Sequence, residues 1–160
     1  MILDTYSGKI RKLFSICKKH KLKIRTAESC TGGALAYCMT HLPGSSDFFD
    51  QGFVTYSNFA KSSVLHINPD FIEHYGAVSF ETSMLMANHI AGDNFISIST
   101  TGILGPDSDE KNTKVGVIYI GVNIRNKHFK VKKFFFTGSR QEIHKKSIEA
   151  SINLSINELT

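Results

Sequence analysis

The chain has 160 residues, of which 41% are hydrophobic and 21% are charged. This length and composition fit one soluble globular domain over residues 1–160, and they exclude disordered and fibrous classes of protein. The net charge of +5 is concentrated at one end, because residues 1–25 carry eight basic side chains against one acidic side chain, and the rest of the chain carries 11 basic against 13 acidic ones.

The sequence contains no apolar run near the roughly 20 residues that span a bilayer, and its N-terminus lacks a signal-peptide pattern. We therefore expect a cytoplasmic protein without a membrane partner. The three cysteines, Cys17, Cys30 and Cys38, form neither an even set nor a CxxC pair. Neither a disulfide framework nor a thiolate zinc site is expected from this pattern.

The first predicted element is an amphipathic helix in the basic segment, with Ser7 as its N-cap. Ile10, Leu13, Phe14 and Cys17 recur at spacings of three and four, which places apolar residues on one face and the lysines on the other. The basic charge is therefore interpreted as a solvated helix face, and nucleic-acid binding through this helix is the alternative.

Periodicity and turn residues predict the other elements in chain order. Strands are expected at 22–27, 53–56, 95–101, 115–122 and 128–136. Helices are expected at 34–40, at 58–66 with Asn58 as the N-cap, at 68–75 after a break at Pro69, at 81–91 and at 140–159. Helices separate the early strands and the later strands are adjacent, which favours an α/β sandwich with a mixed sheet.

The segment TAESCTGG at residues 26–33 lies where a strand passes into a helix. Backbone N–H groups at a helix N-terminus can bind a phosphate or stabilise an oxyanion, and Gly32 and Gly33 allow close approach to the backbone. Ser29 is accordingly a candidate nucleophile or phosphate ligand. The alternative is that Ser29 or Thr31 only caps the helix.

A serine nucleophile needs a base, and none of the seven histidines stands in a recognisable triad pattern. Lys61 is a second candidate, because burial lowers the pKa of a lysine, and Tyr56 could relay a proton or orient the amine. By itself, Lys61 is far more typical of a solvated helix lysine. Cys30, beside Ser29, is a further possible nucleophile or a buried inert thiol.

The segment TTGILGP at residues 100–106 ends a predicted strand. Ligands bind at the carboxyl ends of strands in open α/β sheets, so this loop and the TAESCTGG turn could face one crevice. An ordinary Gly-Pro turn is the alternative. A metal site is not expected, because Pro69 interrupts the helix on which His66, Asp70 and His74 would align.

Six segments occur in the order found in one known family: TAESCTGG (26–33), LPGSSDFFDQGFVTYSNFAK (42–61), HYGAVSFET (74–82), TTGILGP (100–106), VGVIYIGV (115–122) and TGSRQEI (137–143). On these segments the chain resembles the CinA C-terminal domain family, the competence/damage-inducible CinA-like nicotinamide-nucleotide amidohydrolases. The resemblance covers about residues 5–158. We expect the stand-alone form, since the N-terminal domain of longer CinA proteins has no room here.

The resemblance implies a three-layer α/β/α sandwich with a mixed, mostly parallel sheet, a homodimer, and no metal or cofactor. It implies hydrolysis of the carboxamide of nicotinamide mononucleotide, a small pyridine nucleotide, to nicotinic acid mononucleotide and ammonia in pyridine nucleotide recycling. Ser29 would be the nucleophile and Lys61 its base, with Tyr56 assisting. The residues implied to contact substrate are Cys30, Thr31, Gly32, Gly33, Thr101, Gly102, Gly105 and Arg140.

Within that resemblance, N–H groups of the turn at 30–33 would stabilise the oxyanion, and Arg140 would hold the phosphate. The chain departs from the family pattern at Leu104, at 107–109, at Ser139 and at His144, where relatives commonly have small residues, glycines, an aspartate and an arginine. These departures support an alternative interpretation as a catalytically weak nucleotide-binding or regulatory module.

Overall fold

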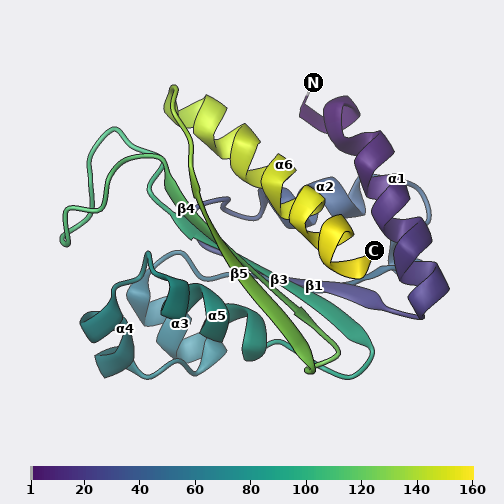
Figure 1. Cartoon of the computed structure of the whole chain (residues 1–160), viewed down its shortest axis with the longest axis horizontal. Helices are drawn as coiled ribbons and strands as arrows, with labels where there is room; N and C mark the ends of the chain where they lie inside the picture. Colours follow the sequence, from purple (N-terminus) through teal and green to yellow (C-terminus); the bar gives the residue numbers. More distant parts are fainter. Residues whose placement is uncertain (1) are drawn as a thin grey trace.

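The computed structural model describes residues 2–160, with side chains from residue 5 onward, and is built on one five-stranded sheet (Figure 1). The strand order is β2-β1-β3-β4-β5. The strands are β1 (Lys23–Glu28), β2 (Phe49–Val54), β3 (Phe95–Gly102), β4 (Val117–Ile124) and β5 (His128–Phe135). β1 pairs in parallel with β2 and β3, whereas β4 runs antiparallel to β3 and β5, so only β4 opposes the common strand direction.

Helices cover both faces of this sheet (Figure 1). One layer holds α1 (Ile2–His20), α2 (Ala34–Thr40) and α6 (Arg140–Leu159), and the other holds α3 (Asn58–Leu65), α4 (Pro69–Tyr75) and α5 (Phe80–Asn88). Each layer closes its own apolar cluster against the sheet. The predicted α/β/α sandwich with a mixed, mostly parallel sheet is confirmed. None of the described helices combines the length and apolar character that a membrane span requires.

Two predicted helix starts are wrong. α1 begins at Ile2, so Ser7 lies inside the helix and is not its N-cap. α3 is capped by Ser57, whose hydroxyl accepts a hydrogen bond of 3.0 Å from the Ala60 N–H, while the predicted cap Asn58 is the first helical residue. Periodic apolar residues show where a helix lies. The backbone conformation just before its first turn decides which polar residue caps it.

The strand predicted at 53–56 also has different bounds, because β2 runs from Phe49 to Val54. This edge strand is mostly exposed and its alternation of apolar and polar residues is weak. Its start is determined by parallel pairing with β1, in which Ile24 lies opposite Phe49. Residues 55 and 56 leave the sheet and are free to approach α3.

β3 separates the two apolar clusters because its side chains alternate between the faces of the sheet. Ile98 points into the larger cluster, which α1, α2 and α6 cover. Ser97 and Ser99 occupy the opposite face, and their hydroxyls donate to the carbonyls of Ile90 (3.1 Å) and Ser83 (2.7 Å). These buried hydrogen bonds attach the α5 region to the centre of the sheet.

Gly121 of β4 allows α5 to lie this close to the sheet. A Cβ at this position would be 2.5 Å from the Ser99 Oγ and 2.9 Å from the Ser83 carbonyl oxygen. We expect Gly121→Ala to lower the free energy of unfolding by about 1–3 kcal/mol in urea denaturation, because the core has no room for the methyl group. Gly8→Ala, at an open position of α1, is the control and should be neutral or stabilising by up to about 1 kcal/mol. Equal effects of the two substitutions would contradict the packing argument.

Candidate active site

The carboxyl ends of β1, β2 and β3 meet at one edge of the sheet. Glu28, the last residue of β1, lies opposite both Val54 and Thr100 in the two neighbouring strands. Backbone hydrogen bonds continue the alignment into the loops, since the Ser29 N–H donates to the Thr100 carbonyl (2.9 Å) and the Thr55 N–H donates to the Glu28 carbonyl (2.8 Å). The topology therefore brings the two loops that the sequence singled out to the edge at which ligands bind in α/β sheets.

Ser29 and Lys61 are in direct contact at this edge. The Lys61 Nζ lies 3.0 Å from the Ser29 Oγ, and it also donates to the carbonyls of Thr55 (3.0 Å) and Tyr56 (3.2 Å). A neutral amine has two N–H bonds and one lone pair. When the two carbonyls take the two N–H bonds, the lone pair faces the serine hydroxyl, which is the orientation that a general base requires.

Burial sets the protonation of Lys61. The side chain is 1% exposed, and desolvation lowers the pKa of its amine from 10.5 to about 8. Its hydrogen-bond acceptors besides Ser29 are neutral carbonyls. The amine can therefore lose its proton near neutral pH. In contrast, burial raises the pKa of the neighbouring Cys30 thiol to about 12, which leaves Ser29 as the better nucleophile at this turn.

Tyr56 takes part through its backbone. Its carbonyl orients the Lys61 amine, while its phenol side chain is 62% exposed at the mouth of the site. The proton relay through the phenol that the sequence left open is not needed in this arrangement, because the Lys61 Nζ reaches the Ser29 Oγ directly.

Glu28, which the sequence patterns did not single out, holds the turn together. Its side chain is fully buried, and its carboxylate accepts hydrogen bonds from the N–H groups of Gly33 (3.0 Å), Leu35 (3.0 Å) and Ala36 (2.7 Å) and from the Thr31 hydroxyl (2.6 Å). These N–H groups are the unpaired donors at the N-terminus of α2. Glu28 thus fills that anion site from within the chain. The sequence signal that could have identified Glu28 is its position as an acidic residue between a predicted strand and a glycine turn.

This arrangement corrects the expectation that all N–H groups of the turn at 30–33 are free for a ligand. Gly33 donates to Glu28, and Gly32 donates to the Ser29 carbonyl (3.1 Å). Both glycines have positive φ, +60° and +93°, which accounts for two glycines in succession. In the described part of the chain, the N–H groups of Cys30 and Thr31 donate to no backbone carbonyl, and they lie beside the nucleophile.

Two adjacent clefts open at the site. The smaller cleft, of about 210 Å³, contains Ser29 and Lys61, and the larger cleft has a volume of about 840 Å³. Residues that line both clefts are Cys30, Tyr56, Leu104 and Arg140. The larger cleft also contains Thr31, Gly32, His144 and Lys145. A ligand with a small reactive end and a larger polar remainder would fit this pair of clefts.

The predicted substrate contacts from the second loop fall into two groups. Thr101 and Gly102 line the smaller cleft, although the Thr101 hydroxyl already donates to the Ala77 carbonyl (2.7 Å). Gly105 lines neither cleft, and its carbonyl accepts a hydrogen bond from the Arg140 guanidinium. Arg140 therefore ties this loop to the start of α6 and stands at the junction of the clefts.

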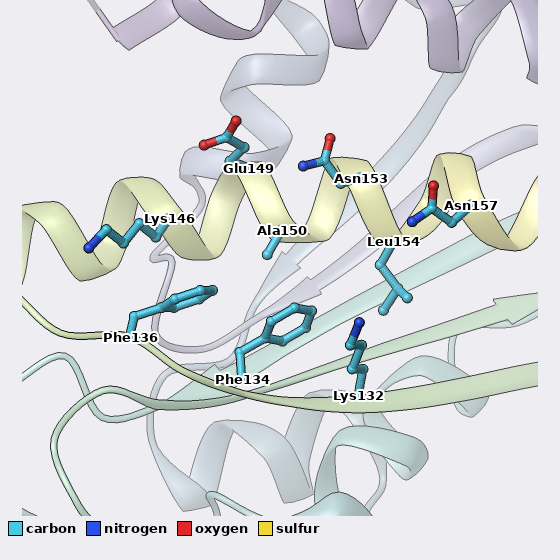
Figure 2. A pocket seen from close by; sticks show the side chains of 9 residues that line it. All are labelled: Lys132, Phe134, Phe136, Lys146, Glu149, Ala150, Asn153, Leu154 and Asn157. Atoms are coloured by element: carbon cyan, nitrogen blue, oxygen red, sulfur yellow. The ribbon is translucent and has the colours of Figure 1, made fainter.

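A separate cavity of about 280 Å³ lies between β5 and α6 (Figure 2). The rings of Phe134 and Phe136 are stacked with centroids 5.5 Å apart, and the Lys132 ammonium lies 5.2 Å from the Phe134 ring centroid. No serine, cysteine or histidine lines this cavity, and it shares no lining residue with the two clefts. In the part of the chain that the structure describes, no group of three His, Cys, Asp or Glu side chains is placed to hold a metal ion.

The chain is similar to one family of known proteins over almost its whole length. The model of the CinA C-terminal domain matches residues 8–159. The chain is 44% identical over 136 residues to a protein named competence-damage inducible protein from Clostridium acetobutylicum, covering 83% of this chain and 33% of that protein. A Clostridium tetani protein of the same name is 39% identical over 152 residues, covering 94% of this chain and 36% of its own length. The chain thus spans about a third of the length of these curated relatives.

The fold of this chain is also similar to the folds of solved structures of related proteins. A competence or damage-inducible protein from Enterobacter asburiae superposes with a TM-score of 0.90 at 31% identity, covering 95% of this chain and 96% of that chain. A competence-damaged protein (CinA) superfamily protein from Enterobacter cloacae superposes with a TM-score of 0.89 at 30% identity, covering 95% and 90%.

Glu28→Gln tests the internal anion at the N-terminus of α2. An amide offers one acceptor oxygen where the carboxylate offers two, and it turns its NH₂ toward backbone N–H donors. We expect the free energy of unfolding to fall by about 3 kcal/mol or more in urea denaturation. The control is Glu149→Gln, which removes a surface ion pair with Lys9 and should cost less than about 1 kcal/mol. A similarly small loss for Glu28→Gln would show that α2 finds other acceptors.

Lys61→Met tests the lowered pKa of the buried amine. The pKa of this amine is about 8 in the folded protein and 10.5 when unshifted, so the unfolded state binds more protons between these pH values. The contribution of Lys61 to stability therefore rises with pH through this window, and we expect wild type to gain about 1 kcal/mol relative to the variant between pH 8 and pH 9. Urea denaturation of both proteins at the two pH values measures this gain. A difference that stays constant with pH would refute it.

Proposed function

Because the chain belongs to the CinA C-terminal domain family, we propose that it is an amidohydrolase that converts nicotinamide mononucleotide to nicotinic acid mononucleotide and ammonia. One observation carries this proposal: a buried amine lies 3.0 Å from the Ser29 Oγ, with two carbonyls occupying its other hydrogen-bonding directions. A merely structural lysine has no reason to be buried without a carboxylate partner. A base beside a serine explains this burial.

In the proposed reaction, the Ser29 Oγ attacks the carboxamide carbon and the Lys61 Nζ takes the hydroxyl proton. The N–H groups of Cys30 and Thr31, which directly follow the nucleophile, would stabilise the resulting oxyanion. As the C–N bond breaks, Lys61 returns its proton to the leaving nitrogen, which departs as ammonia. Water then attacks the ester carbon and gives a proton to Lys61, which returns it to the Ser29 Oγ as the carboxylic acid leaves.

The two clefts would bind different parts of the proposed substrate. The smaller cleft, with Ser29 and Lys61, takes the ring and its carboxamide, and the larger cleft takes the ribose phosphate. The cations Arg140 and Lys145 and the His144 imidazole line the larger cleft, which makes this the side on which a phosphate would bind. Because Glu28 fills the N-terminus of α2, these side chains, rather than the glycine turn, are the proposed phosphate ligands.

A second candidate function is a nucleotide-binding module with weak catalysis. It is favoured by the hydrogen bonds that already engage two of the proposed phosphate ligands. The Arg140 guanidinium donates to the Gly105 carbonyl, and the His144 Nε2 lies 2.9 Å from the Thr31 carbonyl oxygen. Ligand binding without ammonia release would support this second function over the first.

Ammonia release from nicotinamide mononucleotide, without added metal, is the direct test of the proposed reaction. We expect Ser29→Ala and Lys61→Met each to lower kcat by at least about 10³-fold, because nucleophile and base act as a unit. The kcat/KM of wild type should rise with pH and level off above about 8, since only the deprotonated amine is a base.

The matched controls are Ser63→Ala on the exposed side of α3 and Lys12→Met on α1, which should retain wild-type turnover. Circular dichroism and urea denaturation of all variants separate loss of chemistry from loss of folding. Wild-type turnover in Ser29→Ala would reject the nucleophile, and a kcat/KM that does not change between pH 6 and pH 9 would reject Lys61 as the base.

A further inference from the structure

The loop between β3 and β4 brings an acidic side chain to the catalytic cleft. This loop, residues 103–116, projects beyond the strand ends (Figure 1). Asp109 in the loop lines the same cleft of about 210 Å³ as Ser29 and Lys61. A cavity of this volume is about 7 Å across, so a ring bound inside it lies close enough to the wall to interact with a charge there.

The hydrogen bonds of Asp109 leave half of its carboxylate unused. The Oδ1 atom accepts the N–H groups of Lys111 (3.2 Å) and Thr113 (2.7 Å), which fixes the side chain in the loop. In the described structure, the Oδ2 atom has no hydrogen bond, and Asp109 has no lysine, arginine or histidine nitrogen within 4.0 Å. The Lys111 ammonium points elsewhere and donates to the His74 carbonyl (3.4 Å). No cation in the described part of the chain therefore forms an ion pair with Asp109.

The other charged side chains that line the small cleft are Lys61 and Arg140. Lys61 is directed at Ser29 and two carbonyls, and Arg140 is directed at Gly105. Both side chains are thus hydrogen-bonded to groups other than Asp109. Among the residues that line this cleft, Asp109 is the only acidic one.

We propose that Asp109 determines substrate specificity by selecting a positively charged heteroaromatic ring over a neutral ring of the same shape. This inference rests on the proposed function and adds the ring charge to it. A pyridine ring that is substituted on its nitrogen by a sugar carries a positive charge, whereas its dihydro form is neutral. Asp109 attracts the charged form and leaves the neutral form without that attraction.

A cationic ring also fits the state that Lys61 needs. A positive charge in a cleft of this size repels the protonated lysine and favours the neutral amine, which is the form that acts as a base. Without Asp109, no acidic side chain on the wall of this cleft would attract the charged ring. The carboxylate thus allows a cationic substrate and a lysine base to share one small cleft.

Asp109→Asn separates this role from a purely structural one. The amide oxygen of asparagine can still accept the N–H groups of Lys111 and Thr113, so the loop keeps its conformation while the charge is lost. Asp107→Asn is the matched control. Asp107 is exposed in the same loop and lines neither cleft, so its substitution changes the net charge by the same amount at a different place.

The experiment measures binding by isothermal titration calorimetry to the Ser29→Ala protein, which prevents turnover. The ligands are nicotinamide mononucleotide and its 1,4-dihydro form, which share the ribose phosphate and the carboxamide and differ in ring charge. We expect the charged form to bind about tenfold more tightly, and Asp109→Asn to bring that ratio close to one. Asp107→Asn should leave the ratio unchanged.

The inference is overturned if the parent protein does not prefer the charged form, if it binds neither nucleotide, or if Asp109→Asn retains the preference. Failure of the proposed function is a different result, because it is measured as absence of ammonia release by wild type. A protein that prefers the charged form through Asp109 and releases no ammonia would support the ring selection and refute the hydrolysis.

Discussion

The geometry of the site depends on the buried carboxylate of Glu28. A carboxylate without solvent is costly unless hydrogen bonds replace its hydration, and three N–H groups at the start of α2 together with the Thr31 hydroxyl do so. The same contacts fix the distance between the end of β1 and the start of α2. Ser29 lies between these two points, so the position of its Oγ follows from a hydrogen-bond network that it does not join.

This network changes how the glycine turn should be interpreted. A helix N-terminus after a glycine turn commonly binds a phosphate from a ligand, and the sequence pattern at 26–33 favours that interpretation. Here the chain supplies the anion itself, and the turn retains only the N–H groups next to the nucleophile. Its function therefore shifts from binding a substrate phosphate to holding a nucleophile and receiving an oxyanion. Positive charge for a phosphate has to come from the start of α6.

Sequence patterns predicted the layers and most elements, because apolar spacings of two, three and four follow directly from the periods of strands and helices. They located α2 and α6 at 34–40 and 140–159, the bounds that the structure shows. They misplaced the bounds of β2, whose start depends on pairing with β1, as well as the N-terminus of α1 and the N-cap of α3. These features depend on contacts between segments, which composition and spacing do not encode.

The same distinction applies to the site. Ser29 and Lys61 were named as candidates on local pattern and on resemblance, but only the fold shows that their reactive atoms meet, since 32 positions separate them. By spacing alone Lys61 is an ordinary helix lysine, and its burial against the edge of the sheet is a property of the tertiary structure. Glu28 was overlooked for the opposite reason: its partners are near in sequence, but they become donors only after α2 has formed.

Charge placement explains why Glu28 and Lys61 can both be buried near Ser29 without pairing. A carboxylate that contacted the Lys61 amine would raise its pKa and keep it protonated, which would remove the base. Neutral carbonyls of Thr55 and Tyr56 orient the amine instead, and the Glu28 carboxylate is directed to the N–H groups of α2. The acid next to the nucleophile in the sequence thus supports the backbone. The lysine, which comes from another helix, is left able to lose its proton.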